Sequence, residues 1–172
     1  MLSSNLNIRL AQPSDVEDIM FIMKDTKKNM KNKSWLCTDG MNEEYLCEIM
    51  KSGFILVAED FGGIGAFLIV WYPKDSEENL GRDLNLPKKE LSKVVHMEMV
   101  AVVPELRGRG LQFKLMKKAE DILSVMHFRY YMATVHPKNV FCMTNLKLLG
   151  YTVKDTKVKY GGTLRNIMIK VK

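Results

Sequence analysis

The sequence predicts an α/β (α+β) fold in which helices flank a central mixed β-sheet. A length of 172 residues suits one domain, residues 1–172, with its own core. Apolar residues make up 47% of the chain and charged residues 27%, the usual mixture of a globular protein. In the second half, strand patterns alternate with helix patterns, which indicates at least one parallel pair of strands. The expected order of elements is β α α β β β α β α β β.

The first elements are a short strand and two helices. Apolar and polar residues alternate over residues 7–11, as in a strand. A helix is expected over residues 13–30, because apolar residues recur there at helical spacing (Val16, Ile19, Met20 and Met23). A second helix is expected from Asn42 to Lys51, before Gly53.

Lysines gather at the end of the first expected helix, at Lys24, Lys27, Lys28, Lys31 and Lys33. Cations near a helix C-terminus complement the helix dipole. We therefore expect a solvated basic face here rather than a binding patch.

The middle of the chain predicts a hairpin, an insertion and a long strand. Residues 54–60 and 64–72 form the two strands of the hairpin, around Gly62-Gly63. Residues 73–90 are polar and predict an insertion with one helical turn. The longest strand is expected over residues 93–103, and Pro104 ends it.

The clearest helix pattern runs from Gly108 to Met126. One face of it is apolar, through Leu111, Leu115, Met116, Ala119, Ile122, Leu123 and Met126. The remaining elements are a strand at 130–135, a helix at 138–149 that ends at Gly150, and strands at 151–159 and 164–171.

Composition excludes several classes of protein. The 3 cysteines have no CxxC spacing, so we expect reduced thiols rather than a disulfide scaffold. The longest apolar run, residues 64–72, is about half of the roughly 20 residues that span a bilayer, and no signal sequence opens the chain. His96, His127 and His136 lie in separate expected elements, so no metal site is expected. These observations predict a cytoplasmic protein without membrane contact.

The segment that carries chemistry is Met97 to Met116, a strand, a proline stop, a glycine-rich turn and a helix in succession. Glycines let a backbone approach a ligand closely, and a helix N-terminus offers free N–H groups to an anion. Arg107 and Arg109 add charged donors, so the segment suits a phosphate or pyrophosphate. The alternative is an ordinary strand–helix turn with solvated arginines. No Lys-Ser or Lys-Thr follows the glycines, and Phe113 stands where a dinucleotide fingerprint needs glycine, so neither of those two phosphate motifs fits.

The turn PELRGRGLQ resembles the acetyl-CoA loop of the GNAT N-acetyltransferase superfamily, whose pattern is R/Q-x-x-G-x-G/A. Arg107 begins the pattern and Gly110 supplies its middle glycine, whereas Gln112 departs from the final Gly/Ala. Residues 134–151 resemble the family's second motif, in which Asn139 opens a helix that ends in Leu149-Gly150-Tyr151. Both motifs lie in the expected elements.

The resemblance implies a fold and a cofactor site. The GNAT-like fold has a mostly antiparallel sheet of six to seven strands, with one splayed parallel pair and about four flanking helices. Backbone groups of Val100, Ala101 and Val102 are expected to pair with the pantetheine arm of acetyl-CoA. The pyrophosphate is expected on the stretch from Gly108 through Gly110 and Leu111 to Gln112, with Arg107 and Arg109 nearby. Asn139 is expected to contact the pantetheine or to begin its helix, with Cys142 one turn later; Cys142 is a small buried residue rather than a nucleophile.

The resemblance also implies direct acetyl transfer to a primary amine in a ternary complex. Glu98, four residues before Val102, matches the position of the family's general base. His96 is the alternative base or a partner of Glu98; a structural ion pair is the other reading of Glu98. The tyrosine that protonates the leaving thiolate in this family is replaced by Leu146. Tyr151 matches a core aromatic.

The function expected is acetyl transfer from acetyl-CoA to an amine of a small molecule rather than a peptide. The acceptor is expected between the segment Thr26–Met41 and the turn Tyr160–Thr163. A non-catalytic acetyl-CoA-binding module and a nucleic-acid-binding protein are the alternatives, and a monomer or homodimer is expected. Residues 99–172 carry a net charge of +10 and residues 1–98 a net −4, within a total of +6. The basic half holds both motifs, which favours an anionic cofactor over nucleic acid, of which no motif is present.

Overall fold

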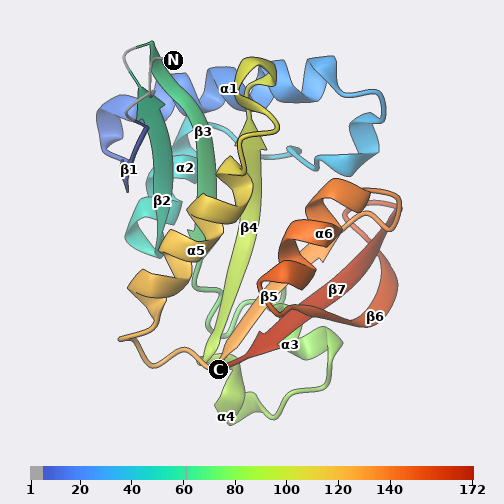
Figure 1. Ribbon diagram of the computed structural model, residues 1–172. Helices are drawn as coiled ribbons and strands as arrows, with labels where there is room; N and C mark the ends of the chain where they lie inside the picture. Colours follow the sequence, from blue (N-terminus) through green and yellow to red (C-terminus); the bar gives the residue numbers. More distant parts are fainter. Residues whose placement is uncertain (1–5, 61) are drawn as a thin grey trace.

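The computed structural model describes residues 6–60 and 62–172 and has a seven-stranded sheet in the order β1-β2-β3-β4-β5-β7-β6 (Figure 1). The strands are β1 (Asn7–Leu10), β2 (Gly53–Asp60), β3 (Gly63–Trp71), β4 (Val94–Val102), β5 (Tyr130–Val135), β6 (Thr152–Lys159) and β7 (Thr163–Val171). Neighbouring strands are antiparallel except β4 and β5, which are parallel. The expected mixed, mostly antiparallel sheet with one parallel pair is therefore confirmed.

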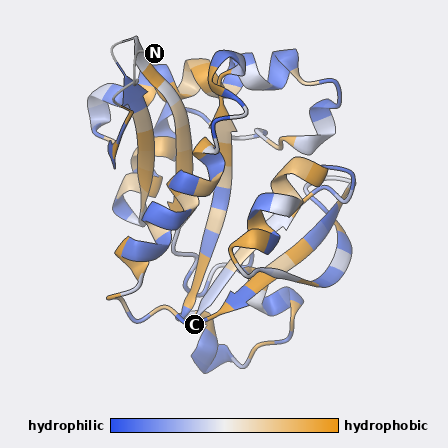
Figure 2. Cartoon of the chain, in the orientation of Figure 1, coloured by the Kyte–Doolittle hydropathy of each residue, from blue (hydrophilic) through white to orange (hydrophobic). Residues whose placement is uncertain are grey.

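Helices cover both faces of this sheet. They are α1 (Val16–Asn29), α2 (Glu43–Lys51), α3 (Leu80–Asp83), α4 (Lys88–Leu91), α5 (Leu111–Leu123) and α6 (Val140–Leu148), with 3-10 turns η1 (Pro13–Asp15), η2 (Lys33–Trp35) and η3 (Pro104–Leu106). The buried residues of α5 and α6 share one core with β2, β3 and β4, and those of α1 and α2 share a second core on the other face. Figure 2 shows the apolar residues along β2 and β3 and the alternation of polar and apolar residues on α5.

Two expected elements differ from the structure. The helix expected from Gly108 begins at Leu111, because Gly110 is its N-cap and has a left-handed φ of 69°. The insertion after β3 holds two short helices, α3 and α4, where one turn was expected. Asn79 organises this insertion: its fully buried amide donates to the carbonyls of Lys74 and Leu91, and its Oδ1 accepts from the Gly81 N–H.

The strand β4 contains an extra residue at Glu98. Met97 lies opposite Val70 and Met99 opposite Ile69, so consecutive residues of β3 leave Glu98 without a partner, as in a β-bulge. The bulge shifts the side-chain alternation by one residue. Before it, Met97 packs in the core beneath α5; after it, Met99 packs in the core beneath α1.

The bulge lies where β4 and β5 separate. Their parallel ladder pairs Val94 with Tyr130 and ends at His96 with Met132, two residues before Glu98. From there the strands diverge toward the end of β4 that leads to α5 (Figure 1). The expected splayed pair is confirmed, and its opening begins at the expected catalytic glutamate.

Candidate active site

The divergence of β4 and β5 leaves one edge of β4 open. Beyond His96, the ladders of the described residues pair β4 with β3 alone. An unpaired strand edge presents N–H and C=O groups that an extended amide-containing ligand can use as a further strand. The predicted residues Val100, Ala101 and Val102 lie on this part of β4. The Val102 carbonyl already accepts a hydrogen bond from Arg107 Nε at 3.1 Å.

The loop between β4 and α5 has room for an anion. Gly108 and Gly110 have φ of 76° and 69°, and a Cβ built on either meets no atom within 4 Å. Within residues 6–60 and 62–172 no side chain caps the N-terminus of α5, so the first N–H groups of this helix, at Leu111 and Gln112, have no capping partner there. Arg109 is exposed beside them. Left-handed glycines, free amides and an arginine make this loop a suitable phosphate site.

Gln112 joins α5 to α6. Its Nε2 donates to Cys142 Sγ at 3.1 Å, and its Oε1 accepts from Asn145 Nδ2 at 3.1 Å. The departure from Gly/Ala at this position therefore adds a contact between helices. Asn139 is the N-cap of α6, and its side chain accepts a hydrogen bond from the Cys142 N–H at 3.2 Å. Of the two roles expected for Asn139, the structure shows the one in which it begins the helix. Burial raises the pKa of the Cys142 thiol, which fits a structural rather than a nucleophilic cysteine.

The pair His96–Glu98 lies at the bulge. His96 is 2% exposed, and its Nε2 accepts a hydrogen bond from the Leu80 N–H at 3.0 Å. The neutral ring therefore carries its proton on Nδ1, which lies 3.4 Å from Glu98 Oε2. Because the acceptor nitrogen of His96 is occupied, the geometry fits a partner of Glu98 better than a base. The Glu98 side chain is 18% exposed and remains in reach of solvent.

Asn79 supports this pair indirectly, since it folds the insertion whose Leu80 N–H holds His96. Asn79→Ala leaves buried carbonyls unpaired, and we expect it to lower the free energy of unfolding by about 2–3 kcal/mol. Urea denaturation measures the change. Asn29→Ala is the control, because Asn29 is exposed and its side chain bonds to Asp25 alone among the described residues. Equal stability of the two variants would contradict the role of Asn79.

Arg165 of β7 contacts both segments that are expected to border the acceptor, Thr26–Met41 and Tyr160–Thr163. Its guanidinium donates to the carbonyls of Ser34 and Trp35, at 2.6 and 3.1 Å, and to Cys37 Sγ at 2.7 Å. Arg165 is 3% exposed. Arg165 Nε and Trp35 Nε1 are buried donors without a hydrogen-bond partner among the described residues. The three hydrogen bonds of Arg165 therefore fix the segment between α1 and α2 on this side of the molecule.

Two tyrosines face the same region. The Tyr160 hydroxyl lies 3.1 Å from Thr134 Oγ1, and the Arg165 guanidinium lies 5.7 Å from the centre of the Tyr160 ring. Burial and the charge of Glu98 raise the pKa of Tyr160 to about 12 and also raise the pKa of Tyr45, so both phenols stay protonated at neutral pH. Sequence reasoning missed both Tyr45 and Arg165. The pattern around Tyr45 indicates a core residue of a helix, and the pattern around Arg165 indicates a polar position of a strand.

Leu146, at the usual position of the acid, is 1% exposed and belongs to the core beneath α5 and α6. Tyr151 is also 1% exposed, as expected of a core aromatic. Over residues 6–60 and 62–172, no group of three or more His, Cys, Asp or Glu could hold a metal ion. Within the same residues, none of the helices has the length and apolar character of a membrane span.

Comparison with known proteins places this architecture in a family. A family model described as "Acetyltransferase (GNAT) family" matches residues 27–151. The fold matches a putative acetyltransferase, yncA, from Salmonella typhimurium, solved with its cofactor acetyl-CoA; the two share 21% identity, with 98% of this chain and 94% of that chain covered and a TM-score of 0.71. It also matches a ribosomal-protein-alanine N-acetyltransferase from Brucella melitensis at 18% identity, with 96% and 99% covered and a TM-score of 0.74.

A third solved structure, Ard1 from Thermoplasma volcanium, shares 14% identity over 96% of this chain and 97% of that chain, with a TM-score of 0.73. No curated protein sequence matches the chain significantly. At these identities the solved structures establish the fold alone, whereas the family model covers most of the chain. With the match over residues 27–151, the chain belongs to the GNAT acetyltransferase family and is an acetyl-CoA-dependent N-acetyltransferase.

Proposed function

We propose that this enzyme transfers the acetyl group of acetyl-CoA directly to a primary amine of a small molecule, in a ternary complex. The observation that carries the proposal is the His96–Glu98 pair, because it sits at the point where β4 loses its pairing with β5. A carboxylate at that point can take a proton from an amine that approaches acetyl-CoA bound along the open edge of β4.

Acetyl-CoA is held along that edge and by the loop that follows it. Val100, Ala101 and Val102 offer backbone groups to the amides of the pantetheine arm. The free amides of α5 at Leu111 and Gln112 receive the pyrophosphate, and Gly108 and Gly110 leave space for it. Arg107 and Arg109 add positive charge to the same loop.

Glu98 is the proposed general base. An ammonium group with a pKa near 10 has no lone pair, so its proton must leave before attack. Glu98 takes this proton, directly or through water, and the Nδ1–H of His96 stabilises the charge of the carboxylate. The amine nitrogen then attacks the thioester carbonyl and the C–N bond forms. The nitrogen gives up its second proton to water as the C–S bond breaks, which leaves a neutral amide.

The departing group is the thiolate of CoA. A thiol with a pKa near 8.5 is a tolerable leaving group at neutral pH. Leu146 offers no proton from the position where the family usually has a tyrosine. The thiolate therefore leaves as such and takes a proton from water.

The acceptor binds between the segment that holds Trp35 and the β6–β7 turn. The three hydrogen bonds of Arg165 fix the α1–α2 segment across this side, which favours a small molecule over a folded peptide.

A screen of amines for acetyl-CoA-dependent thiol release tests this function. Release with one class of small amines supports it, and release with peptides alone would contradict the acceptor assignment. Binding of acetyl-CoA without release across a broad panel would favour a non-catalytic module. Steeply salt-dependent binding of DNA or RNA, without stabilisation by acetyl-CoA, would favour nucleic acid.

Acetyl-CoA should also stabilise the folded protein. At 100 times its dissociation constant, a ligand of the folded state alone adds about 2.7 kcal/mol to the free energy of unfolding. Thermal denaturation with increasing acetyl-CoA measures this gain, and desulfo-CoA, which keeps the pyrophosphate and lacks the thioester, should give a similar one. A flat titration would contradict the proposed site.

A further inference from the structure

The short helix α3 of the insertion contacts two strands that are far apart in the sequence. At its start, the Leu80 N–H donates to His96 Nε2 of β4 at 3.0 Å. At its end, the Asp83 carboxylate accepts a hydrogen bond from Lys159 Nζ of β6 at 2.5 Å. The backbone carbonyl of Asp83 also accepts from Lys157 Nζ, at 2.6 Å. The helix therefore connects the strand that carries the proposed base with the strand that leads into the β6–β7 turn.

A third, small core fixes α3 on the sheet. Leu80 is 2% exposed and packs there with residues of β4, β5 and β7, namely Val94, Met132, Ile167 and Ile169. His96 is two residues from Val94 on β4, so the two side chains point to the same face of the sheet. Apolar packing, and not polar contacts alone, therefore sets the position of α3 beside His96.

The β6–β7 turn has a backbone conformation that its neighbours must hold in place. Residues 160–162 have φ of 51°, 74° and 119°. The left-handed region is costly for a residue with a side chain, so Tyr160 stays in it only where surrounding contacts fix it. Lys159, which is bound to Asp83, directly precedes Tyr160. The Tyr160 hydroxyl lies 3.1 Å from Thr134 Oγ1 of β5, so Tyr160 is held through its chain neighbour and through its ring.

The Asp83–Lys159 ion pair is partly withdrawn from solvent. The two side chains are 20% and 19% exposed, and a pair of this kind is screened less than one on the open surface. Asp155, by contrast, lies on β6 itself and pairs with Lys157 of the same strand at 3.3 Å. The Asp83 pair therefore joins two elements, whereas the Asp155 pair stays within one.

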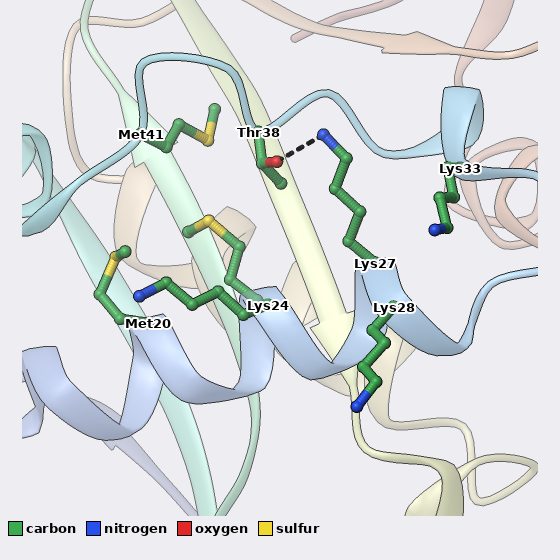
Figure 3. Close-up of a pocket in the computed structure, with 8 residues that line it drawn as sticks. Met20, Lys24, Lys27, Lys28, Lys33, Thr38 and Met41 are labelled. Atoms are coloured by element: carbon green, nitrogen blue, oxygen red, sulfur yellow. Dashed lines mark hydrogen bonds between the residues drawn. The ribbon is translucent and has the colours of Figure 1, made fainter.

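The opposite border of the proposed acceptor site is held by other contacts. Lys27 of α1 donates from Nζ to Thr38 Oγ1 at 2.8 Å and so ties α1 to the segment between α1 and α2 (Figure 3). Arg165 holds the same segment at the carbonyls of Ser34 and Trp35. None of these bonds involves α3. Loss of the link from α3 to β6 should therefore act on the β6–β7 turn and leave this border in place.

We propose that Asp83 is a positioning residue for the acceptor amine, because through Lys159 it sets the place of Tyr160 relative to Glu98. The inference rests on the proposed function, in which the acceptor lies between the α1–α2 segment and the β6–β7 turn. Burial and the charge of Glu98 raise the pKa of Tyr160 to about 12, so the two groups are near enough to interact. The other end of α3 holds His96, the partner of Glu98. One helix thus places both the base and one wall of the acceptor site.

Asp83→Ala removes the carboxylate and keeps the bond from Lys157 to the carbonyl of residue 83, so we expect the insertion to stay docked. The acceptor is the amine that reacts fastest in the screen described above. Its KM should rise by about fivefold or more, while kcat and the KM for acetyl-CoA change by less than about twofold, as expected when binding alone is weakened. The control Asp155→Ala removes the same charge within β6 and should leave all three constants unchanged. A pair that served stability alone would lower the urea midpoint of Asp83→Ala and leave the acceptor KM unchanged, which would overturn the proposal.

Lys159→Met and the double variant Asp83→Ala/Lys159→Met test whether Asp83 acts through Lys159. Each should raise the acceptor KM to the level of Asp83→Ala, because the second substitution removes a partner that has already lost its contact. Effects that multiply in the double variant would contradict this route.

Fluorine NMR of the chain labelled with fluorotyrosine tests the link without turnover. The Tyr160 signal, assigned with Tyr160→Phe, should shift or broaden in Asp83→Ala and stay unchanged in Asp155→Ala. The signal of Tyr131, in the core beneath α5 and α6, should stay in place in both variants. An unchanged Tyr160 signal would overturn the link whatever the enzyme acetylates.

The outcomes separate this inference from the proposed function. If no amine of the panel is acetylated, the proposed function and the positioning role fail together. An active enzyme whose acceptor KM is unchanged in Asp83→Ala would overturn the positioning role alone.

Discussion

Glu98→Gln is expected to lower kcat by a factor of about 10²–10⁴ while the affinity for acetyl-CoA stays unchanged. The amide has the shape of the carboxylate and keeps an oxygen facing His96 Nδ1, which lies 3.4 Å from Glu98 Oε2, so we expect the bulge of β4 to be retained. It cannot take a proton from the ammonium of the acceptor. Steady-state kinetics and calorimetric titration of acetyl-CoA separate the two effects.

The pH dependence of this variant identifies the lost step. Without a base, attack requires the small fraction of acceptor that is already neutral, and this fraction rises as pH approaches the pKa of the amine. The rate of Glu98→Gln should therefore climb toward that of the wild type at high pH. An ion pair that served structure alone would show no such recovery.

Glu44→Gln is the matched control, because Glu44 is an exposed carboxylate on α2. It removes the same charge from the same acidic half of the chain and should leave kcat and its pH profile unchanged. Wild-type turnover in Glu98→Gln at neutral pH would reject Glu98 as the base. A parallel loss of acetyl-CoA affinity would instead mean that the substitution disturbs the cofactor edge of β4.

Local chemistry explains why the turn before α5 and the start of α6 could be predicted from the sequence. Gly110 takes a left-handed φ at the end of the loop that connects β4 to α5. Asn139 caps α6 through its own side chain. Both features depend on residues within a few positions of each other. The sequence predicted these turns, whereas it put the start of the helix after the loop three residues too early, because Leu111 is the first residue past the glycine cap.

The features that sequence reasoning missed depend on distant contacts. The extra residue at Glu98 is hidden because β4 is buried on both faces before it, from Val94 to Met97, so no alternation marks the shift. Arg165 reads as an ordinary polar residue in a strand. It is buried because it holds carbonyls 130 and 131 positions away, at Trp35 and Ser34, and no local pattern encodes that pairing.

Gly110→Val is expected to lower the affinity for acetyl-CoA at least tenfold, which corresponds to about 1.4 kcal/mol. Gly110 has a φ of 69°, and its absent Cβ faces open space at the N-terminus of α5. A valine there strains the backbone and fills the space that we propose for the pyrophosphate. The strain alone should cost about 1–2 kcal/mol of stability.

Gly40→Val separates strain from occlusion. Gly40 has a φ of 78° and also meets nothing within 4 Å, but it lies between α1 and α2, away from the cofactor loop. Both valine variants should lose similar stability by urea denaturation, since both place a β-branched residue in the left-handed region. Only Gly110→Val should lose acetyl-CoA affinity by calorimetry. Equal affinities in the two variants would mean that the pyrophosphate lies elsewhere than on the first amides of α5.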